Sequence, residues 1–467
     1  MALDVATFET IIPSRFLSFT IPHPALHTQL LRVAVLDSPV QPSDSPVVAA
    51  LFVPENRESD WIFFTESGHL QLLLSSPGIS RLILVGKNPT NVPDSIMISH
   101  KREKDTQFVK NLENSLKPLF IALSPRISVK NRIFDIPILH YEDNLICSVV
   151  LERSVGVLVG EMLVEDVEIE SDNELDDNRR KREFRRRMRF KRMPNLIQTE
   201  IRIVPEAEFV LDRVRIGGEV EFRPDTGVLV HPYLIPMVAG MSIVGPHIED
   251  RIQNGLKPKA LCLGVGGGAL LSFLRIQLGF EVFGVEMDEE VLRVAKQYFG
   301  LQDSEIQVFV GDAIEYLETL ASGGRSSNLV HSGVGEDQLN LATGFATKFD
   351  VIMVDLDSCD ARSGISAPPL ELIQRHILLA ASSIICEFGA LIVNVIPPSR
   401  SFYDTLIHKF REFFHKLYEI DVGNGENFVL VATMQPVLLP ASESQNTFLK
   451  ELKGVVLEKY LDSIRKI

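Results

Sequence analysis

Residues 259–287, KALCLGVGGGALLSFLRIQLGFEVFGVEM, decide the fold of this chain. The apolar run at 260–263 is typical of a buried parallel strand, and it ends in a glycine turn at 264–268. Leucines then recur at helical spacing until a second strand, 281–285, which ends in Glu286. This order predicts a βαβ mononucleotide-binding unit. Its glycines let the backbone approach a ligand, and its terminal acid accepts hydrogen bonds from ribose hydroxyls.

The glycine turn alone leaves the ligand open. Gly264, Gly266 and Ala269 satisfy the G-x-G-x-x-G/A fingerprint of dinucleotide folds, and their spacing to Glu286 suits a dinucleotide or S-adenosylmethionine. A tight turn in an α/β domain that binds nothing is a third interpretation. The residues downstream are needed to choose among them.

Acids follow the next two predicted strands as well. The strand at 306–310 leads to Asp312, and the strand at 349–354 leads to Asp355 and Asp357. Because like charges repel, several acids at one sheet edge are difficult to explain as stabilising features. A ligand with hydroxyl, amino and cationic groups explains them together, whereas a dinucleotide's pyrophosphate would be repelled. The acids therefore favour S-adenosylmethionine as the cofactor.

The later elements complete a fold class. Further strands are predicted at 390–395 and 427–433, and the last one follows a Gly-Asn-Gly turn at 423–425. An antiparallel final strand is typical of the S-adenosylmethionine-dependent class I methyltransferases. The sequence thus predicts an α/β fold with a Rossmann-like, mostly parallel seven-stranded sheet.

The chain is long enough for several domains. We expect an α/β or β-rich accessory domain at 1–160 without a catalytic constellation. An acidic and then basic linker at 161–194 follows, and then a β-layer with a lead-in helix at 195–245. The catalytic domain is expected at 246–467.

The basic segment RRKREFRRRMRFKR begins at Arg179 and ends at Arg192. We interpret it as part of a solvated linker that the preceding acids neutralise. Docking of an acidic partner, nuclear targeting and RNA binding are the alternatives. The net charge of −15 argues against general nucleic-acid binding, so no nucleic-acid partner is expected.

Composition suggests a cytosolic protein. The four cysteines are widely spaced and have no histidine ligands nearby, so reduced thiols and no metal site are expected. The first residues lack the apolar region of a signal peptide, and no apolar run reaches membrane-spanning length. A cytoplasmic location without membrane contact is therefore predicted.

Several motifs resemble one known family. They are LGVGGGAL at 263–270, VEMDEEVLRVAKQYFG at 285–300, GDAIEYL at 311–317, FDVIMVDLDSCD at 349–360 and SAPPLEL at 366–372. From about residue 196 to 436 the chain resembles the spermidine-synthase-like methyltransferases. The resemblance points to the C-terminal domain of the methyltransferase-like family members that methylate a lysine and the N-terminus of elongation factor 1-alpha.

The resemblance implies roles for particular residues. It implies methyl transfer by an SN2 reaction from S-adenosylmethionine to a protein amine, N-terminal or lysine, with elongation factor 1-alpha as a possible protein substrate. The residues implied in cofactor binding are Gly264, Gly266 and Gly268 at the methionine moiety, Glu286 at the ribose, Met287 at the adenine face, and Asp312 with Ala313 at the adenine edge.

The resemblance leaves the catalytic acid open. In polyamine aminopropyltransferases the first Asp of a D-S-S-D motif helps to deprotonate the attacking amine. Alignment from the strand at 349–354 places that role on Asp355, whereas the letters of the motif place it on Asp357, with Asp360 as the second acid.

Two departures and three alternatives accompany the resemblance. Cys262 stands where many methyltransferases have an acid, and Gly267 stands where aminopropyltransferases have an Asp. Aminopropyl transfer is therefore the alternative activity, and a non-catalytic scaffold of the same fold is another. A dehydrogenase lacks a catalytic His/Lys/Tyr set near the strand ends. His231 and Tyr233 ahead of the catalytic domain are either gate residues or simply a turn and a helix cap.

Overall fold

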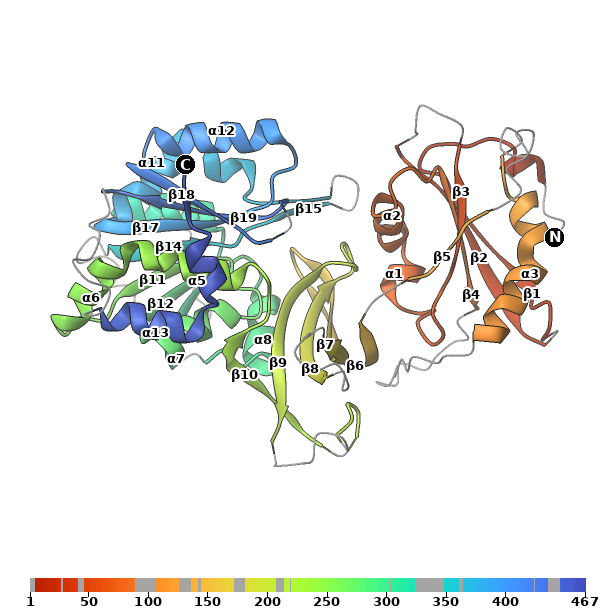
Figure 1. The fold of residues 1–467 in the computed structure, drawn as a ribbon, viewed down its shortest axis with the longest axis horizontal. Helices are drawn as coiled ribbons and strands as arrows, with labels where there is room; N and C mark the ends of the chain where they lie inside the picture. Colours follow the sequence, from red (N-terminus) through yellow and green to blue (C-terminus); the bar gives the residue numbers. More distant parts are fainter. Residues whose placement is uncertain are drawn as a thin grey trace.

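The chain folds around three main sheets, shown in Figure 1. The structure is a computed structural model. It describes residues 5–26, 28–40, 46–88, 106–125, 136–141, 144–171, 181–206, 214–218, 220–302, 304–323, 348–360, 364–423, 425–435 and 446–467. A two-stranded hairpin, β15 (Ser358–Asp360) and β16 (Gly364–Ser366), accompanies the three sheets.

The N-terminal unit is an α/β layer, as predicted. Its sheet has the order β1-β2-β4-β3-β5, with β3 parallel to both β4 and β5. The two faces carry separate apolar cores, one against α1 and α2 and the other against α3. The elements are β1 (Phe16–Pro22), β2 (Leu30–Asp37), β3 (Val48–Phe52), α1 (Trp61–Phe64), α2 (Glu66–Leu74), β4 (Arg81–Lys87), α3 (Thr106–Ala122) and β5 (Ile138–Leu139).

The middle sheet is an antiparallel meander in the order β10-β9-β8-β7-β6. Its strands are β6 (Leu145–Gly156), β7 (Gly160–Ser171), β8 (Lys181–Phe190), β9 (Ile197–Pro205) and β10 (Phe222–Leu229). The predicted linker at 161–194 is therefore wrong, because most of it forms β7 and β8. The expected domain boundary at residue 160 falls at the turn of the β6–β7 hairpin.

Strand β8 holds most of the described part of the basic segment, and its arginines are paired across the sheet. Arg186 contacts Asp166 of β7 at 2.6 Å, and Arg187 contacts Glu200 of β9 at 2.5 Å. Apolar side chains of β8, including Met188, pack against helix α8. Charges that suggest a solvated linker in sequence are neutralised here by acids of the neighbouring strands. Arg179 and Arg180 lie outside the described residues.

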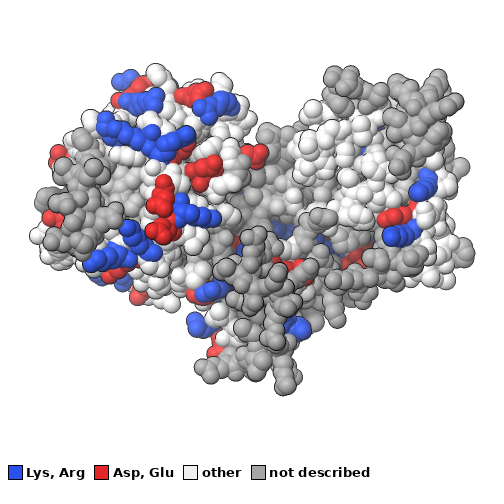
Figure 2. All heavy atoms as spheres, in the orientation of Figure 1, with Lys and Arg blue, Asp and Glu red and all other residues white. Residues whose placement is uncertain are grey.

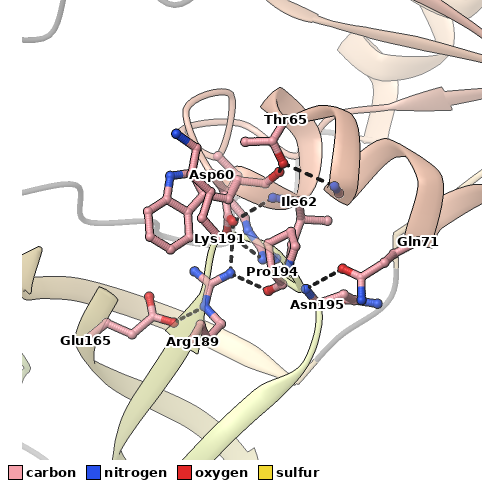
Figure 3. Close-up of polar contacts among 12 residues, drawn as sticks. Asp60, Ile62, Thr65, Gln71, Glu165, Arg189, Lys191, Pro194 and Asn195 are labelled. Atoms are coloured by element: carbon pink, nitrogen blue, oxygen red, sulfur yellow. Dashed lines mark hydrogen bonds and ion pairs between the residues drawn. The ribbon is translucent and has the colours of Figure 1, made fainter. Parts of the chain in front are cut away.

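Polar contacts attach the N-terminal unit to this sheet (Figure 3). The buried Arg189 guanidinium bridges Asp60 at 3.1 Å and Glu165 at 2.7 Å, and it also donates to the Pro194 carbonyl. The Asn195 backbone N–H donates to the Gln71 side chain at 2.9 Å.

The third sheet has the order β13-β12-β11-β14-β17-β19-β18-β20. Strands β13, β12, β11, β14 and β17 run parallel, and β19 runs antiparallel between β17 and β18. This is the predicted class I methyltransferase sheet, extended by the two-residue strand β20. The strands are β11 (Lys259–Leu263), β12 (Glu281–Glu286), β13 (Ile306–Val310), β14 (Phe349–Val354), β17 (Ile385–Val395), β18 (Lys416–Asp421), β19 (Phe428–Thr433) and β20 (Arg465–Lys466).

Helices cover both faces of this sheet. One face packs on α5 (Leu234–Gly240), η3 (Met241–Val244), α6 (Gly245–Gln253), α7 (Ala269–Leu278), α13 (Thr447–Val455) and α14 (Glu458–Asp462). The other packs on α9 (Ala313–Ala321), η5 (Leu370–Ile373), α11 (Arg375–Ile384) and α12 (Arg400–Arg411). Helix α8 (Glu289–Tyr298) contributes to the core under the middle sheet as well, so that the two sheets share packing.

The surface gives two further observations. None of the described helices is both long enough and apolar enough to cross a membrane. On the face shown in Figure 2, Lys and Arg side chains lie among Asp and Glu over the third sheet and its helices.

Candidate functional site

A cavity of about 490 Å3 lies at the carboxyl ends of β11, β12 and β14. Ligands of open α/β sheets bind at this edge, and the volume is within the usual range for small-molecule sites. The middle sheet forms the opposite wall. Eight of the ten predicted site residues line the cavity: Gly264, Gly266, Glu286, Met287, Asp312, Ala313, Asp355 and Asp357.

The glycine turn adopts a conformation that side chains would prevent. Gly264 has φ +87° and Gly266 has φ +53°, and a Cβ at Gly264 would collide with the Asp355 carbonyl. The turn thus lies directly against the end of β14. The Gly267 N–H donates to Thr199 Oγ1 at 2.8 Å, which attaches the turn to β9 of the middle sheet.

Gly268 does not line the cavity, contrary to the resemblance-based expectation. It has φ +79° immediately before α7, and a Cβ there would meet Leu301. Backbone conformation and packing explain this glycine without a ligand.

Glu286 is buried at the end of β12. Its carboxylate accepts from the Gly266 N–H at 3.1 Å, the Val265 N–H at 3.2 Å and the Asp288 N–H at 3.2 Å. Burial raises the pKa of Glu286, and these N–H donors oppose the rise. The acid therefore fixes the glycine turn while it faces the cavity.

The remaining predicted cofactor residues flank Glu286. Met287 is 49% exposed at the cavity edge. Asp312 caps α9 by accepting from the Ile314 N–H at 2.7 Å, so helix capping explains at least one of its carboxylate oxygens. Ala313 begins that helix.

Asp355 lies in a hydrogen-bonded cluster on the cavity floor. Its Oδ2 accepts from the Tyr233 hydroxyl at 3.0 Å, and its Oδ1 accepts from the Asn394 amide at 3.1 Å. Burial raises the pKa of Asp355 to about 6, although both donors oppose the rise and the charge of Asp357 adds to it. Burial and the Asp355 charge likewise raise the pKa of Tyr233 well above its usual value.

The other two candidate acids differ from Asp355. Asp357 lines the cavity with an exposed side chain, so it is the more accessible carboxylate. Asp360 ends β15, and its side chain lies outside the described residues.

Sequence reasoning missed one wall of the cavity. Met188, Phe190, Arg192, Gln198 and Thr199 line it from β8, β9 and the segment between them. Most of this wall falls in the segment that we assigned to a linker. No local pattern indicates it, since only the pairing of β8 with β7 and β9 brings these side chains to the glycine turn.

The β6–β7 turn closes another side of the cavity. Asp288 Oδ2 accepts from the Leu158 N–H at 2.7 Å and the Val159 N–H at 3.1 Å, and Val159 lines the cavity. A Cβ at Gly156 would collide with the Asp288 carboxylate. The hairpin is therefore held against the start of α8.

One group of metal-binding residue types comes together in the described part of the chain, away from the cavity. The ligand atoms of His247, Asp350 and Cys386 lie within 4.8 Å of one another. Asp350 already accepts from His247 at 2.7 Å and from the Lys259 N–H at 2.8 Å, and Arg251 lies 3.5 Å away. These partners account for the buried carboxylate without a metal ion.

The residues present fit S-adenosylmethionine. Gly264 and Gly266 line the cavity without side chains, so their backbone is open to a ligand, and Glu286 is placed to accept from hydroxyl groups. Acids on several strand ends suit a cationic ligand.

Comparison with known proteins found several similar methyltransferases. No protein-family model matches the chain. It is 26% identical over 429 residues to a curated protein of Danio rerio and 25% identical over 420 residues to one of Homo sapiens. Both carry the name eEF1A lysine and N-terminal methyltransferase. The chain is similar to these methyltransferases.

The matches cover 89% and 86% of this chain, and so extend beyond the segment from 196 to 436 into the N-terminal residues. They cover 55% and 53% of the relatives, so the chain spans about half the length of the curated relatives it matches.

Two solved structures also resemble the chain. Human methyltransferase-like protein 13 in complex with SAH is 24% identical, with a TM-score of 0.38 over 50% of this chain and 93% of that one. Spermidine synthase from Thermotoga maritima is 15% identical, with a TM-score of 0.38 over 67% and 83%.

Proposed function

We propose that this chain is an S-adenosylmethionine-dependent methyltransferase that acts on a protein amine. One observation carries the proposal: the glycine turn, Glu286 and two further acids, Asp355 and Asp357, share one cavity at the ligand-binding edge of a class I sheet. The similarity to named protein methyltransferases supports it.

The chain's own residues define where the cofactor is held. Gly264 and Gly266 would lie against the methionine part, Glu286 would accept from the ribose hydroxyls, and Met287, Asp312 and Ala313 would surround the adenine. When bound, S-adenosylmethionine supplies a methyl group on a positively charged sulfur. Acids at the cavity floor favour that charge.

The acceptor amine must lose a proton before it attacks, because free α-amino and lysine groups have pKa values of about 8 and about 10.4. We propose that the exposed Asp357 receives and orients the amine. Asp355 uses its oxygens to hold Tyr233 and Asn394, which fixes the cavity floor. Most of the acceleration then comes from alignment of the reacting atoms.

The substrate protein is proposed from the relatives. Their names specify eEF1A with lysine and N-terminal sites, so eEF1A is the first acceptor to test, at either kind of amine. A cytosolic location is proposed from the sequence alone.

Packing at Gly267 argues against the alternative, aminopropyl transfer. A Cβ at this position would collide with Thr199 and meet Phe299 at 3.0 Å. The turn therefore has no room for the acid that aminopropyltransferases carry there, and that acid would be needed to bind a cofactor amine.

Calorimetric titration with S-adenosylmethionine tests the proposal, with decarboxylated S-adenosylmethionine in parallel. We expect Glu286→Ala to weaken binding by about 10- to 100-fold, because a buried acceptor for the ribose is lost. Glu281→Ala is the matched control, since Glu281 begins the same strand and pairs near the surface with Lys259.

Three outcomes separate the candidate functions. Binding of the carboxylated cofactor that fails only in the Glu286 variant supports a methyltransferase. Tighter binding of the decarboxylated form would indicate aminopropyl transfer, and binding of neither would leave the scaffold interpretation.

A further inference from the structure

His231 follows β10 and lines the same cavity as Asp355 and Asp357. In the β9–β10 pairing Leu229 lies opposite Ile201. The chain after Leu229 therefore runs back along the beginning of β9, towards Gln198, which also lines the cavity. His231 is thus part of the wall that the middle sheet adds to the catalytic fold.

The ring nitrogen Nε2 of His231 is shielded from solvent and has no hydrogen-bond partner among the described residues. The side-chain nitrogen of Gln198 is also buried and also has no hydrogen-bond partner among the described residues. An unsatisfied buried polar group costs about 1–3 kcal/mol, and native structures contain few of them. Two on one cavity wall indicate a surface built to meet a polar ligand.

The surroundings keep the imidazole neutral. Burial lowers the pKa of His231, and the charges of Arg187 and Arg185 lower it further, whereas Glu200 opposes the change. Tyr233, the other titratable group against the ring, has a raised pKa and is a neutral phenol at physiological pH. A neutral imidazole can accept a proton, whereas an imidazolium cannot.

Tyr233 lies between His231 and the predicted catalytic acid Asp355. The ring centroid of His231 lies 5.3 Å from that of Tyr233, and the Tyr233 hydroxyl donates to Asp355 at 3.0 Å. The imidazole, Asp355 and Asp357 thus line one cavity, with Tyr233 between the imidazole and Asp355.

We propose that Nε2 of His231 accepts the proton of the attacking amine, with the Gln198 amide donating to a carbonyl of the same acceptor. This inference rests on the proposed methyltransferase function. The ammonium group gives one proton to Nε2, which leaves a lone pair on the amine nitrogen. That pair forms the bond to the methyl carbon while the carbon–sulfur bond breaks and its electrons remain on sulfur. The imidazolium gives this proton up to solvent after the methylated product leaves.

The imidazole of His231 suits this step better than the carboxylate of Asp355 does. The oxygens of Asp355 already accept from Tyr233 and Asn394. Nε2 of His231, by contrast, has no hydrogen-bond partner among the described residues, so its lone pair is available for the proton.

Steady-state kinetics of His231→Gln test the proposal, with eEF1A as acceptor and His415→Gln as control at an exposed histidine before β18. Gln keeps a polar atom near Nε2 but cannot take up a proton. We expect kcat to fall by about 100-fold or more and the acid limb of the pH profile to disappear. The dissociation constant for S-adenosylmethionine should stay within about threefold. Added imidazole should partly restore the rate of His231→Ala.

NMR of 15N-histidine-labelled full-length protein provides a readout that does not depend on turnover. The His231 signals, assigned with the Gln variant, should show a neutral ring with a free Nε2 at pH 7. They should shift when ethylamine is added together with S-adenosylhomocysteine.

Different results overturn the two proposals. A His231→Gln variant with an unchanged kcat and acid limb, or a protonated His231 at pH 7, would refute the role of His231. A wild-type chain that binds neither S-adenosylmethionine nor S-adenosylhomocysteine would refute the proposed function itself.

Discussion

At the scale of single residues, burial of the Asp355 charge lowers the free energy of unfolding at neutral pH. Its pKa rises from 3.8 to about 6 on folding, with burial as the main cause. The folded state therefore binds the proton more tightly than the unfolded state. The stabilisation that comes from this tighter proton binding is fully present below about pH 3.8 and is lost as the pH rises through about 6.

This difference predicts the behaviour of Asp355→Asn. Relative to wild type, its free energy of unfolding should increase by about 2–2.5 kcal/mol between pH 4 and pH 8, because the amide has no charge to bury. Urea unfolding at several pH values measures this change. Asp404→Asn, in an exposed pair with Arg400, should show a pH dependence below about 0.5 kcal/mol. A flat profile for Asp355→Asn would contradict the prediction.

At the scale of elements, the strand–turn–helix unit from β11 to α7 depends on the close approach of the turn to β14. A Cβ at Gly264 would collide with the Asp355 carbonyl, whereas nothing lies within 4 Å of a Cβ at Gly279. Both glycines have positive φ, at +87° and +69°. The two positions therefore share the conformational requirement but differ in packing.

Alanine substitutions separate these two effects. Gly279→Ala should lower the free energy of unfolding by about 1–2 kcal/mol through backbone strain alone. Gly264→Ala should lower it by about 3–5 kcal/mol, since strain and overpacking combine, and should abolish S-adenosylmethionine binding. Urea unfolding and calorimetry measure both quantities. Equal losses of stability would show that the contact with β14 is unimportant.

At the scale of the whole molecule, one buried arginine links the N-terminal unit to the cavity wall. Arg189 pairs with Asp60 of that unit and lies next to Phe190, which lines the cavity. Burial opposes the ionisation of Asp60, but Arg189, Arg57 and the Ile62 N–H together lower its pKa to about 2. The stabilisation from Asp60 is therefore present above about pH 3.8 and is lost as the pH falls through about 2.

Asp60→Asn tests this link. It should lower the free energy of unfolding by about 2–3 kcal/mol, evenly from pH 5 to pH 8. Trp61, the single tryptophan, lies next to Asp60, so its fluorescence reports on the junction. In the wild-type protein, the urea unfolding transitions followed by fluorescence and by circular dichroism should coincide. In the variant, the fluorescence transition should occur at a lower urea concentration than the circular dichroism transition. Asp404→Asn is again the control, and a pH-dependent loss between pH 5 and 8 would contradict the prediction.

The sequence by itself determined the catalytic sheet and much of one side of the site. The glycine turn, the apolar strands and the acids Glu286, Asp312 and Asp355 are local patterns, and parallel strands bring their carboxyl ends to one edge. Each of these features depends on residues that are close together in the sequence. Hydrophobic periodicity and turn residues therefore predict them.

Only the tertiary structure decided the opposite wall. The arginines of β8 pair with acids of β7 and β9, and this pairing turns an apparent linker into a buried strand. Asp355 likewise meets Tyr233, which is 122 residues away. The pairing of β10 with β9 brings His231 towards Gln198 at the cavity. Strands that pair across such long sequence separations leave no local pattern in the sequence. The partner of a charged side chain, and whether that side chain is buried, is therefore known only once the sheet has folded.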